Sequence, residues 1–256
     1  MPPSYPKRII CLSAEAAEII YALGAGGRIV GVTGFAIEPP AVRHKPRVSG
    51  FSSVNYDKVD ALQPDLVITF SDVQADAAKE LLRRGHTVLA TNQRSLAQIE
   101  ETILLIGRAI GRETQAQKLA AKFHREIFGH RRPRRTKRPR VYFEEWNDPL
   151  ISGIRWVGEL IEVAGGEDIF PELRHKSRAP DRVISPNDVT RRAPDIIVAS
   201  WCGKKVNFDQ IRQRPGWDKI PAIQNNRLYE IKSPYILQPG PSLLKGFRQL
   251  REFINP

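Results

Sequence analysis

Aromatic side chains that directly follow strand-like apolar runs have the most easily interpreted chemistry in this sequence. Trp146 comes soon after the run 140–143, Trp201 follows the run 195–199, and Phe51 lies between a glycine and two serines. In α/β layers, ligands bind outside the carboxyl ends of the strands. Flat apolar rings at such ends can form the walls of a site for a large planar ligand. We therefore expect these three rings to face a ligand.

The alternative for each ring is that it fills a hydrophobic core, and we favour that interpretation for Trp156, which opens a predicted helix. Residues 238–242 contain two prolines before the last helix, where free N–H groups could hold an anionic or carbonyl group; a structural turn explains them equally well. The candidate ligand-binding residues are Ser13, Phe51, Ser52, Trp146, Trp201, Cys202, Gly203 and Gln238.

Motifs for catalysis or metal binding are absent from the sequence. It contains no G-x-x-x-x-G-K-[ST], G-x-G-x-x-G, H-E-x-x-H or G-x-S-x-G pattern, and its five histidines show no spacing typical of zinc sites. Cys11 and Cys202 are too few for a disulfide framework, so we expect free thiols. We predict no catalytic residues, no metal site and no covalently bound cofactor.

The positive charge of the chain is concentrated in one segment. The 256 residues carry a formal charge of +12, and residues 130–140 alone hold seven of the Lys and Arg side chains and no acidic one. Such a run is either a solvated linker or a patch that attracts a polyanion such as nucleic acid or anionic lipid. No apolar run approaches the ~20 residues of a membrane span. The first residues lack the features of a signal peptide, which leaves a cytoplasmic location or an absent leader open.

Strand-like and helix-like segments alternate along both halves of the chain. Apolar runs predict strands, and amphipathic spacing bounded by glycine or capping residues predicts helices. Ser13 is expected to cap the first helix with its side chain. The expected strands are residues 8–12, 29–33, 65–70, 87–90, 140–143, 195–199 and 228–231. The expected helices are residues 14–23, 75–84, 95–110, 114–128, 155–164, 187–192 and 241–254.

An internal repeat organises these elements. Residues 59–68 (VDALQPDLVI) and 189–198 (VTRRAPDIIV) share a valine, a Pro-Asp pair and three aliphatic residues, at an offset of 130. In each copy a short helix must end before the proline, and a buried strand follows. A chance match is the alternative. The repeat predicts an α/β fold of two lobes: 1–112 forms the first, 113–137 a long linker helix and basic segment, and 138–256 the second.

The sequence resembles the helical-backbone (class III) substrate-binding proteins of ABC importers, especially their cobalamin-binding branch. The segments that carry the resemblance are 8–33 (RIICLSAEAAEIIYALGAGGRIVGVT), 59–70 (VDALQPDLVITF), 150–170 (LISGIRWVGELIEVAGGEDIF) and 189–200 (VTRRAPDIIVAS). The resemblance implies two α/β lobes joined by one long helix, a ligand clamped between them, and no enzymatic activity. It implies cobalamin or a related corrinoid as the ligand, with an iron–siderophore or haem as the alternative.

The same resemblance implies a transporter partner. Family members dock on a permease through one acidic residue on each lobe, and Asp57 matches the first position. The repeat places the second at Asn187, which has no charge, so the neighbouring Asp188 is the candidate there. We expect an extracytoplasmic monomer by resemblance, and nucleic acid is not expected as a partner. The alternative from another class is a cytoplasmic α/β enzyme or nucleic-acid-associated protein that uses the basic segment; a soluble relative that does not dock is also conceivable.

Overall fold

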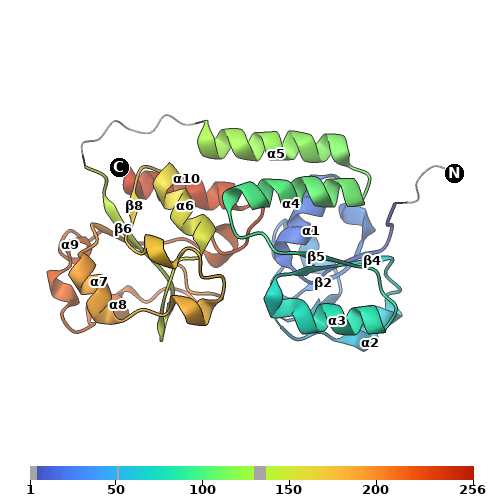
Figure 1. The fold of residues 1–256 in the computed structure, drawn as a ribbon, viewed down its shortest axis with the longest axis horizontal. Coiled ribbons are helices and arrows are strands. Elements are labelled where there is room, and N and C mark those ends of the chain that lie inside the picture. The colour runs from blue at the N-terminus through green and yellow to red at the C-terminus, as the bar shows by residue number, and fades with distance from the viewer. Residues whose placement is uncertain (1–4, 51, 130–136) are drawn as a thin grey trace. The chain divides into compact units, whose positions relative to one another are not determined.

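The computed structural model describes residues 5–50, 52–129 and 137–256, and it divides into two compact units. Unit 1 comprises Met1–Gln93 and Ala97–His124, and unit 2 comprises Arg94–Leu96 and Arg125–Pro256. Each unit has its own sheet with helices packed on it (Figure 1). The predicted α/β class with two lobes is therefore confirmed.

The sheet of unit 1 is entirely parallel in the order β3-β2-β1-β4-β5. The order reverses at β1, which pairs with both β2 and β4. Its strands are β1 (Ile9–Cys11), β2 (Ile29–Thr33), β3 (Arg47–Ser49), β4 (Leu66–Phe70) and β5 (Val88–Thr91). The helices of this half are α1 (Ala14–Ala22), α2 (Tyr56–Ala61), α3 (Ala75–Arg83), α4 (Leu96–Ala109) and α5 (Glu113–Phe128). All strands except β3 were expected.

The sheet of unit 2 has the order β10-β9-β6-β7, with the short β8 also paired to β6. Only β7 runs antiparallel, because it returns from β6 as a hairpin. The strands are β6 (Arg140–Asn147), β7 (Leu150–Ser152), β8 (Glu167–Asp168), β9 (Ile196–Ala199) and β10 (Leu228–Glu230). The helices are α6 (Arg155–Val163), α7 (Pro186–Arg192), α8 (Phe208–Arg212), α9 (Pro221–Gln224) and α10 (Leu243–Ile254). β6 is longer than predicted, and α10 begins after the expected Pro241.

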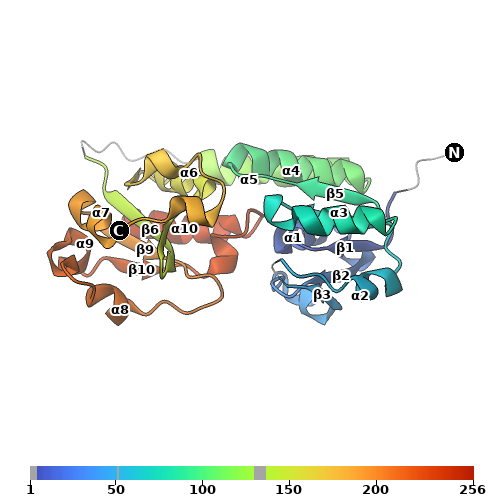
Figure 2. The ribbon, with the colours of Figure 1, turned by 60° about the horizontal axis from the view of Figure 1, so that its bottom comes forward.

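Figure 2 labels the strands β1, β2, β3 and β5 of unit 1 and the strands β6, β9 and β10 of unit 2. Short 3₁₀ turns connect these elements and complete the described structure. They are η1 (Gly26–Arg28), η2 (Pro40–His44), η3 (Asp72–Gln74), η4 (Pro171–Leu173), η5 (Ala179–Arg182), η6 (Trp217–Lys219) and η7 (Ser233–Tyr235). None of the described helices combines the length and the apolar composition that a membrane span requires.

The repeated Pro-Asp sequence adopts the same local geometry in both units. The residue before each proline is left-handed, with φ of 44° at Gln63 and 41° at Ala193. The following aspartates, Asp65 and Asp195, accept hydrogen bonds from the backbone N–H groups of Arg8 (2.9 Å) and Arg140 (2.8 Å) respectively. Each aspartate thereby ties the start of its own strand to the start of the neighbouring strand.

The two units also match in their helix caps and in the register of their strands. Asn55 caps α2 by accepting from the N–H of the third helical residue, and Ser185 caps α7 in the same way. β1 pairs with β4 so that Ile9 lies opposite Leu66, and β6 pairs with β9 so that Val141 lies opposite Ile196. Counting forward from Ile9 and Val141 makes residue 12 of unit 1 equivalent to residue 144 of unit 2.

The expected long helix near the middle of the chain is present as α5. Its apolar stripe is buried at Phe123 and Ile127, as its i, i+4 spacing predicts. α5 packs closely on α4, because a Cβ added to Gly107 would come within 2.2 Å of Ala116 Cβ. The boundary between the two units falls inside α5, after His124. Residues 130–136 of the basic segment lie outside the described residues.

Candidate functional site

Trp146 lies at the carboxyl end of β6, where the sequence placed a ligand-facing ring. Its side chain is half-buried, and its Nε1 donates a hydrogen bond to the carbonyl oxygen of Asp148 at 2.8 Å. The Lys204 ammonium lies 4.4 Å from the centre of the indole ring. A cation in this position is attracted by the ring's electrons. Two segments that the sequence singled out, around Trp146 and around Trp201, therefore meet in the structure.

Trp201 differs from this expectation, because it packs as a core residue. Only 4% of its surface is exposed, and it belongs to a hydrophobic cluster of unit 2 that also contains Tyr142 and Trp217. Its Nε1 donates a hydrogen bond to Oε1 of Glu144 at 2.9 Å. The ring anchors the loop that follows β9 and offers little of its own surface to a ligand. By contrast, the prediction that Trp156 fills a core is confirmed by its 2% exposure.

Glu144 is a fully buried carboxylate that no sequence pattern marked as a candidate. Arg214 holds it with two hydrogen bonds, from Nη1 to Oε2 at 2.5 Å and from Nη2 to Oε1 at 2.9 Å. The pKa of Tyr142 is raised well above its ordinary value, first by burial and then by the Glu144 carboxylate. Isolated charges are rarely buried, but this one has a bidentate partner and an indole N–H donor.

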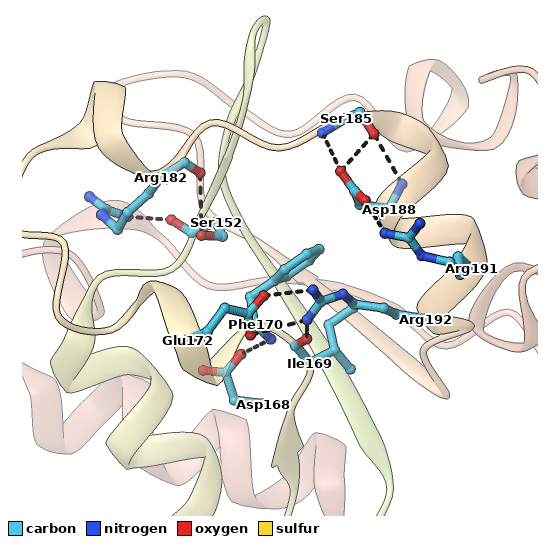
Figure 3. A network of polar contacts seen from close by, with 10 residues as sticks. All are labelled: Ser152, Asp168, Ile169, Phe170, Glu172, Arg182, Ser185, Asp188, Arg191 and Arg192. Atoms are coloured by element: carbon cyan, nitrogen blue, oxygen red, sulfur yellow. Dashed lines mark hydrogen bonds and ion pairs between the residues drawn. The ribbon is translucent and has the colours of Figure 1, made fainter.

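The next residue, Glu145, is held by a second arginine. Arg182 is only 1% exposed and donates from Nη1 and Nη2 to the two Glu145 carboxylate oxygens, at 2.7 and 2.9 Å. Arg182 also donates to the carbonyl oxygen of Ser152 on β7. Figure 3 shows these two residues side by side. The last part of β6 is thus held by two arginines that are distant in the sequence, the buried Arg182 and the partly buried Arg214.

Cys202 and Gly203 form the exposed turn after Trp201. Gly203 adopts a left-handed φ of 71°, and its N–H donates to Ser233 Oγ at 3.5 Å. The pKa of the Cys202 thiol is raised, first by desolvation and then by the Glu145 carboxylate. At neutral pH the thiol is therefore protonated and is a poor metal ligand. Gln238 is half-buried, and its carbonyl accepts from the N–H of Gly240 in the turn before α10.

The candidate residues of unit 1 also lie at the carboxyl ends of strands. Ser13 follows β1 and is 6% exposed, but its Oγ has no hydrogen-bond partner among the described residues, so the expected side-chain cap of α1 is absent. Ser52 is exposed, and Phe51 lies outside the described residues. A hollow of about 370 Å³ lies beside this segment, lined by Arg47, Val48, Ser49, Gly50, Ser53, Val54 and Asn55.

Two residues of unit 1 near the strand ends were not among the candidates predicted from the sequence. Phe35 lies two residues beyond β2 and is 43% exposed, so it has the same strand-end placement as Trp146. Gln74 is buried after β4; its Nε2 donates to the Leu12 carbonyl and its Oε1 accepts from the Phe70 N–H, both at 2.9 Å. The strand-end rule could have found Phe35, but nothing in the local sequence marks Gln74.

The two candidate docking residues have different surroundings. The Asp57 side chain is 98% exposed, and its carboxylate lies 3.7 Å from the Arg84 guanidinium. Asp188 is enclosed in a capping box: its carboxylate accepts from the N–H and Oγ of Ser185 and pairs with Arg191 (Figure 3). The true equivalent of Asp57 on α7 is Asn187, which is exposed and neutral.

Charged clusters elsewhere in the described residues serve structural purposes. Arg192 bridges to Glu172 and donates to the Ile169 carbonyl, and Figure 3 shows this arginine beside the ring of Phe170. No group of three or more His, Cys, Asp or Glu side chains that could hold a metal ion occurs in the described part of the chain.

Comparison with known proteins bears on what such strand-end loops do. A family model described as a periplasmic binding protein matches residues 9–235. The chain belongs to the periplasmic binding protein family. Members of this family are solute-binding proteins and are not enzymes, and the expectation of a substrate-binding protein of an ABC transporter is confirmed at that level. The other class of function, an enzyme or nucleic-acid-associated protein, is not favoured.

Proteins similar to this periplasmic binding protein are named for different ligands or for none. YvrC of Bacillus subtilis, named an uncharacterized ABC transporter substrate-binding lipoprotein, is 29% identical over 98% of this chain and 81% of its own length. The vitamin B12-binding protein of Vibrio parahaemolyticus is 25% identical over 96% of this chain and 88% of its own. The haem-binding protein RhuT of Roseiflexus superposes with a TM-score of 0.84 at 24% identity, covering 97% of each chain, which shows the shared fold.

Proposed function

We propose that this periplasmic binding protein delivers cobalamin or a related corrinoid to an ABC importer. The observation that supports this ligand most is the match along 96% of the chain to a protein named for binding vitamin B12. The strand-end rings support it chemically, because Trp146 and Phe35 offer apolar surface suited to a large planar macrocycle.

The proposed ligand-binding surface consists of the loops at the carboxyl ends of the strands in each unit. In unit 2 these are the end of β6 with Trp146, the turn with Cys202 and Gly203, and the turn at Gln238. In unit 1 they are the ends of β1 and β3, which are followed by the candidates Ser13 and Ser52, together with Phe35 after β2.

Titration of the purified protein with cyanocobalamin tests this proposal. Trp146 is half-buried, whereas Trp156, Trp201 and Trp217 are at most 4% exposed. We therefore expect bound corrinoid to quench tryptophan emission and Trp146→Phe to remove most of the change. The matched control is Trp156→Phe, which alters a core ring and should keep the quenching. Absence of binding at micromolar cyanocobalamin would contradict the corrinoid assignment.

A second candidate ligand is an anionic iron chelate or haem. Lys204 and Lys205 are exposed in the turn that follows β9 and would attract carboxylates. Arg155 is less available, because it already pairs with Glu159 at 2.8 Å. Competition separates the ligands: haem or a ferric siderophore that displaces cyanocobalamin, or binds in its place at lower concentration, identifies this second function.

Location, oligomeric state and docking belong to the same proposal. We propose an extracytoplasmic location, in keeping with the relative named as a lipoprotein, and a monomeric state. It docks on its permease through Asp57, whose 98% exposed carboxylate can exchange its 3.7 Å contact with Arg84 for an arginine of the permease. Asp188 contributes less, because Ser185 and Arg191 already occupy its oxygens.

A further inference from the structure

A continuous chain of contacts leads from the core of unit 2 to Trp146. Glu144 accepts from Trp201 Nε1, and the turn that begins at Trp201 is closed by a hydrogen bond from the Lys204 N–H to the Trp201 carbonyl at 3.1 Å. Lys204 then places its ammonium on the Trp146 ring. The turn that Trp201 anchors therefore brings the exposed Lys204 cation onto the half-buried Trp146 ring.

The buried end of this chain is held from several directions. Arg214 grips both oxygens of Glu144 and lies 4.5 Å from the centre of the Trp217 ring, which in turn packs edge-on against Tyr142. The Ser200 N–H donates to the Glu144 carbonyl at 2.9 Å, which joins the end of β9 to β6. Both carboxylate oxygens of Glu144 therefore have hydrogen-bond donors, which favours a single orientation of this side chain.

Stability alone does not explain a buried ion pair of this kind. Replacing such a pair by apolar residues of similar volume is often neutral or stabilising, because two charges must lose their hydration. An apolar residue also fits in this fold, since the equivalent position of unit 1 is Leu12, which is 1% exposed. A carboxylate supplies what leucine cannot, namely a directional acceptor for the indole N–H of Trp201.

We propose that Glu144 and Arg214 are positioning residues for ligand binding. They orient Trp201 and, through it, hold the turn 201–204 and the Lys204–Trp146 surface in the arrangement that the ligand meets. Ordering this surface before the ligand arrives lowers the entropy that binding must otherwise lose. The inference rests on the proposed function for its ligand, but the order of the turn can be measured without one.

The thiol of Cys202 reports on this turn directly. Cys11 is fully buried, so iodoacetamide at a fixed pH should modify Cys202 first, and mass spectrometry distinguishes the two sites. We expect Glu144→Gln to speed alkylation of Cys202 by about fivefold. The glutamine has only one acceptor oxygen for the donors of Arg214 and Trp201, so the turn is held less firmly; better hydration of the thiol then lowers its raised pKa and increases the reactive thiolate. The double variant Glu144→Leu/Arg214→Met keeps the volume without charges and should show the same acceleration in a folded protein.

Asp168 provides the matched control. It forms an ion pair with Arg174 at 2.9 Å in the same unit, but it lies opposite Val141 at the start of β6, away from the turn. Asp168→Asn should leave the alkylation rate within about twofold of the unmodified protein. Equal rates for Glu144→Gln and Asp168→Asn, or an unchanged rate in the double variant, would overturn the inference.

Binding of cyanocobalamin supplies the second measurement. Glu144→Gln and the double variant should raise the Kd about tenfold, mainly through faster dissociation, whereas Asp168→Asn should not change it. Faster alkylation with an unchanged Kd would overturn the role in binding. If the unmodified protein binds no cyanocobalamin, the proposed ligand is wrong; the alkylation rates then decide whether Glu144 and Arg214 position the turn.

Discussion

Position 12 directly after β1 and position 144 within β6 are equivalent by register, but they are built from different chemistry. In unit 1 the neutral Leu12 follows β1, and the side-chain amide of Gln74 ties its carbonyl to β4. In unit 2 the equivalent position is the buried Glu144, clamped by Arg214. The same backbone framework thus supports a neutral residue, Leu12, in unit 1 and a charged one, Glu144, in unit 2. We call these two positions the neutral end and the charged end. The framework comes from the repeat, whereas the side chains that orient the neighbouring loops are specific to each unit.

The largest expected effect comes from breaking the charged end alone. Arg214→Met leaves the Glu144 carboxylate buried without its partner, and we expect a loss of about 3–5 kcal/mol in the free energy of unfolding. Urea denaturation followed by circular dichroism measures it. Arg212→Met, two residues away on the surface, is the control and should cost less than about 1 kcal/mol. If Arg214→Met lowered the free energy of unfolding by less than about 1 kcal/mol, the charged end would not depend more on its side-chain partner than the neutral end does.

The neutral end should prove less sensitive. Gln74→Ala removes a donor to the Leu12 carbonyl and an acceptor for the Phe70 N–H, and we expect a loss of about 1–3 kcal/mol. The same urea experiment applies, with the exposed Gln115→Ala on α5 as the control. A loss that equals the Arg214→Met value would remove the contrast between the two ends.

The docking helices extend the comparison from the sheets to the surface. Asp57→Asn should reduce ligand uptake in a reconstituted transport assay about tenfold, because it removes an exposed charge from the contact with the permease. Ligand affinity should stay the same. The matched variant Asp188→Asn should reduce uptake less, since that carboxylate is already engaged. Equal losses from the two variants would show that both helices dock through an acid.

Acid sensitivity should give the smallest difference. The pKa of Asp60 is lowered, chiefly by its hydrogen bond to His86 and also by Arg84, and that of Asp188 is lowered, chiefly by Ser185. A carboxylate whose pKa is lowered in the folded state stabilises the protein at pH values above its ordinary pKa of 3.8. This stabilisation is lost as the pH falls through the lowered pKa of the folded state.

Melting temperatures between pH 2 and pH 6 measure this acid sensitivity. The melting temperatures of Asp60→Asn and Asp188→Asn should each fall less steeply with decreasing pH than that of the unmodified protein. Asp57→Asn serves as the control and should follow the unmodified curve. An unchanged slope in both test variants would contradict the prediction.

The sequence predicted the framework well because the framework is local. Each Pro-Asp pair ends one helix and starts one strand within ten residues, and Gly24 and Gly85 end helices with the left-handed φ that glycine tolerates. β3 was missed because it is three residues long with only Val48 buried, too short for a periodic pattern.

The side chains that hold the candidate site could not be found in the same way. Glu144 and Glu145 look like a solvated charged pair in the sequence, and their arginine partners are 70 and 37 residues away. Trp201 was placed correctly at a strand end, but its inward rotation depends on the Glu144 acceptor. Phe35 could have been predicted, because it follows its strand as Trp146 does.

The contact between α4 and α5 has a consequence for engineering. Gly107 leaves no room for even a methyl group against Ala116, so the two helices are spaced as closely as their backbones permit. An alanine or serine at position 107 would act as a wedge and tilt α5 away from α4. A single small substitution, remote from any proposed ligand contact, therefore tests how much of the stability of unit 1 depends on this close helix pair.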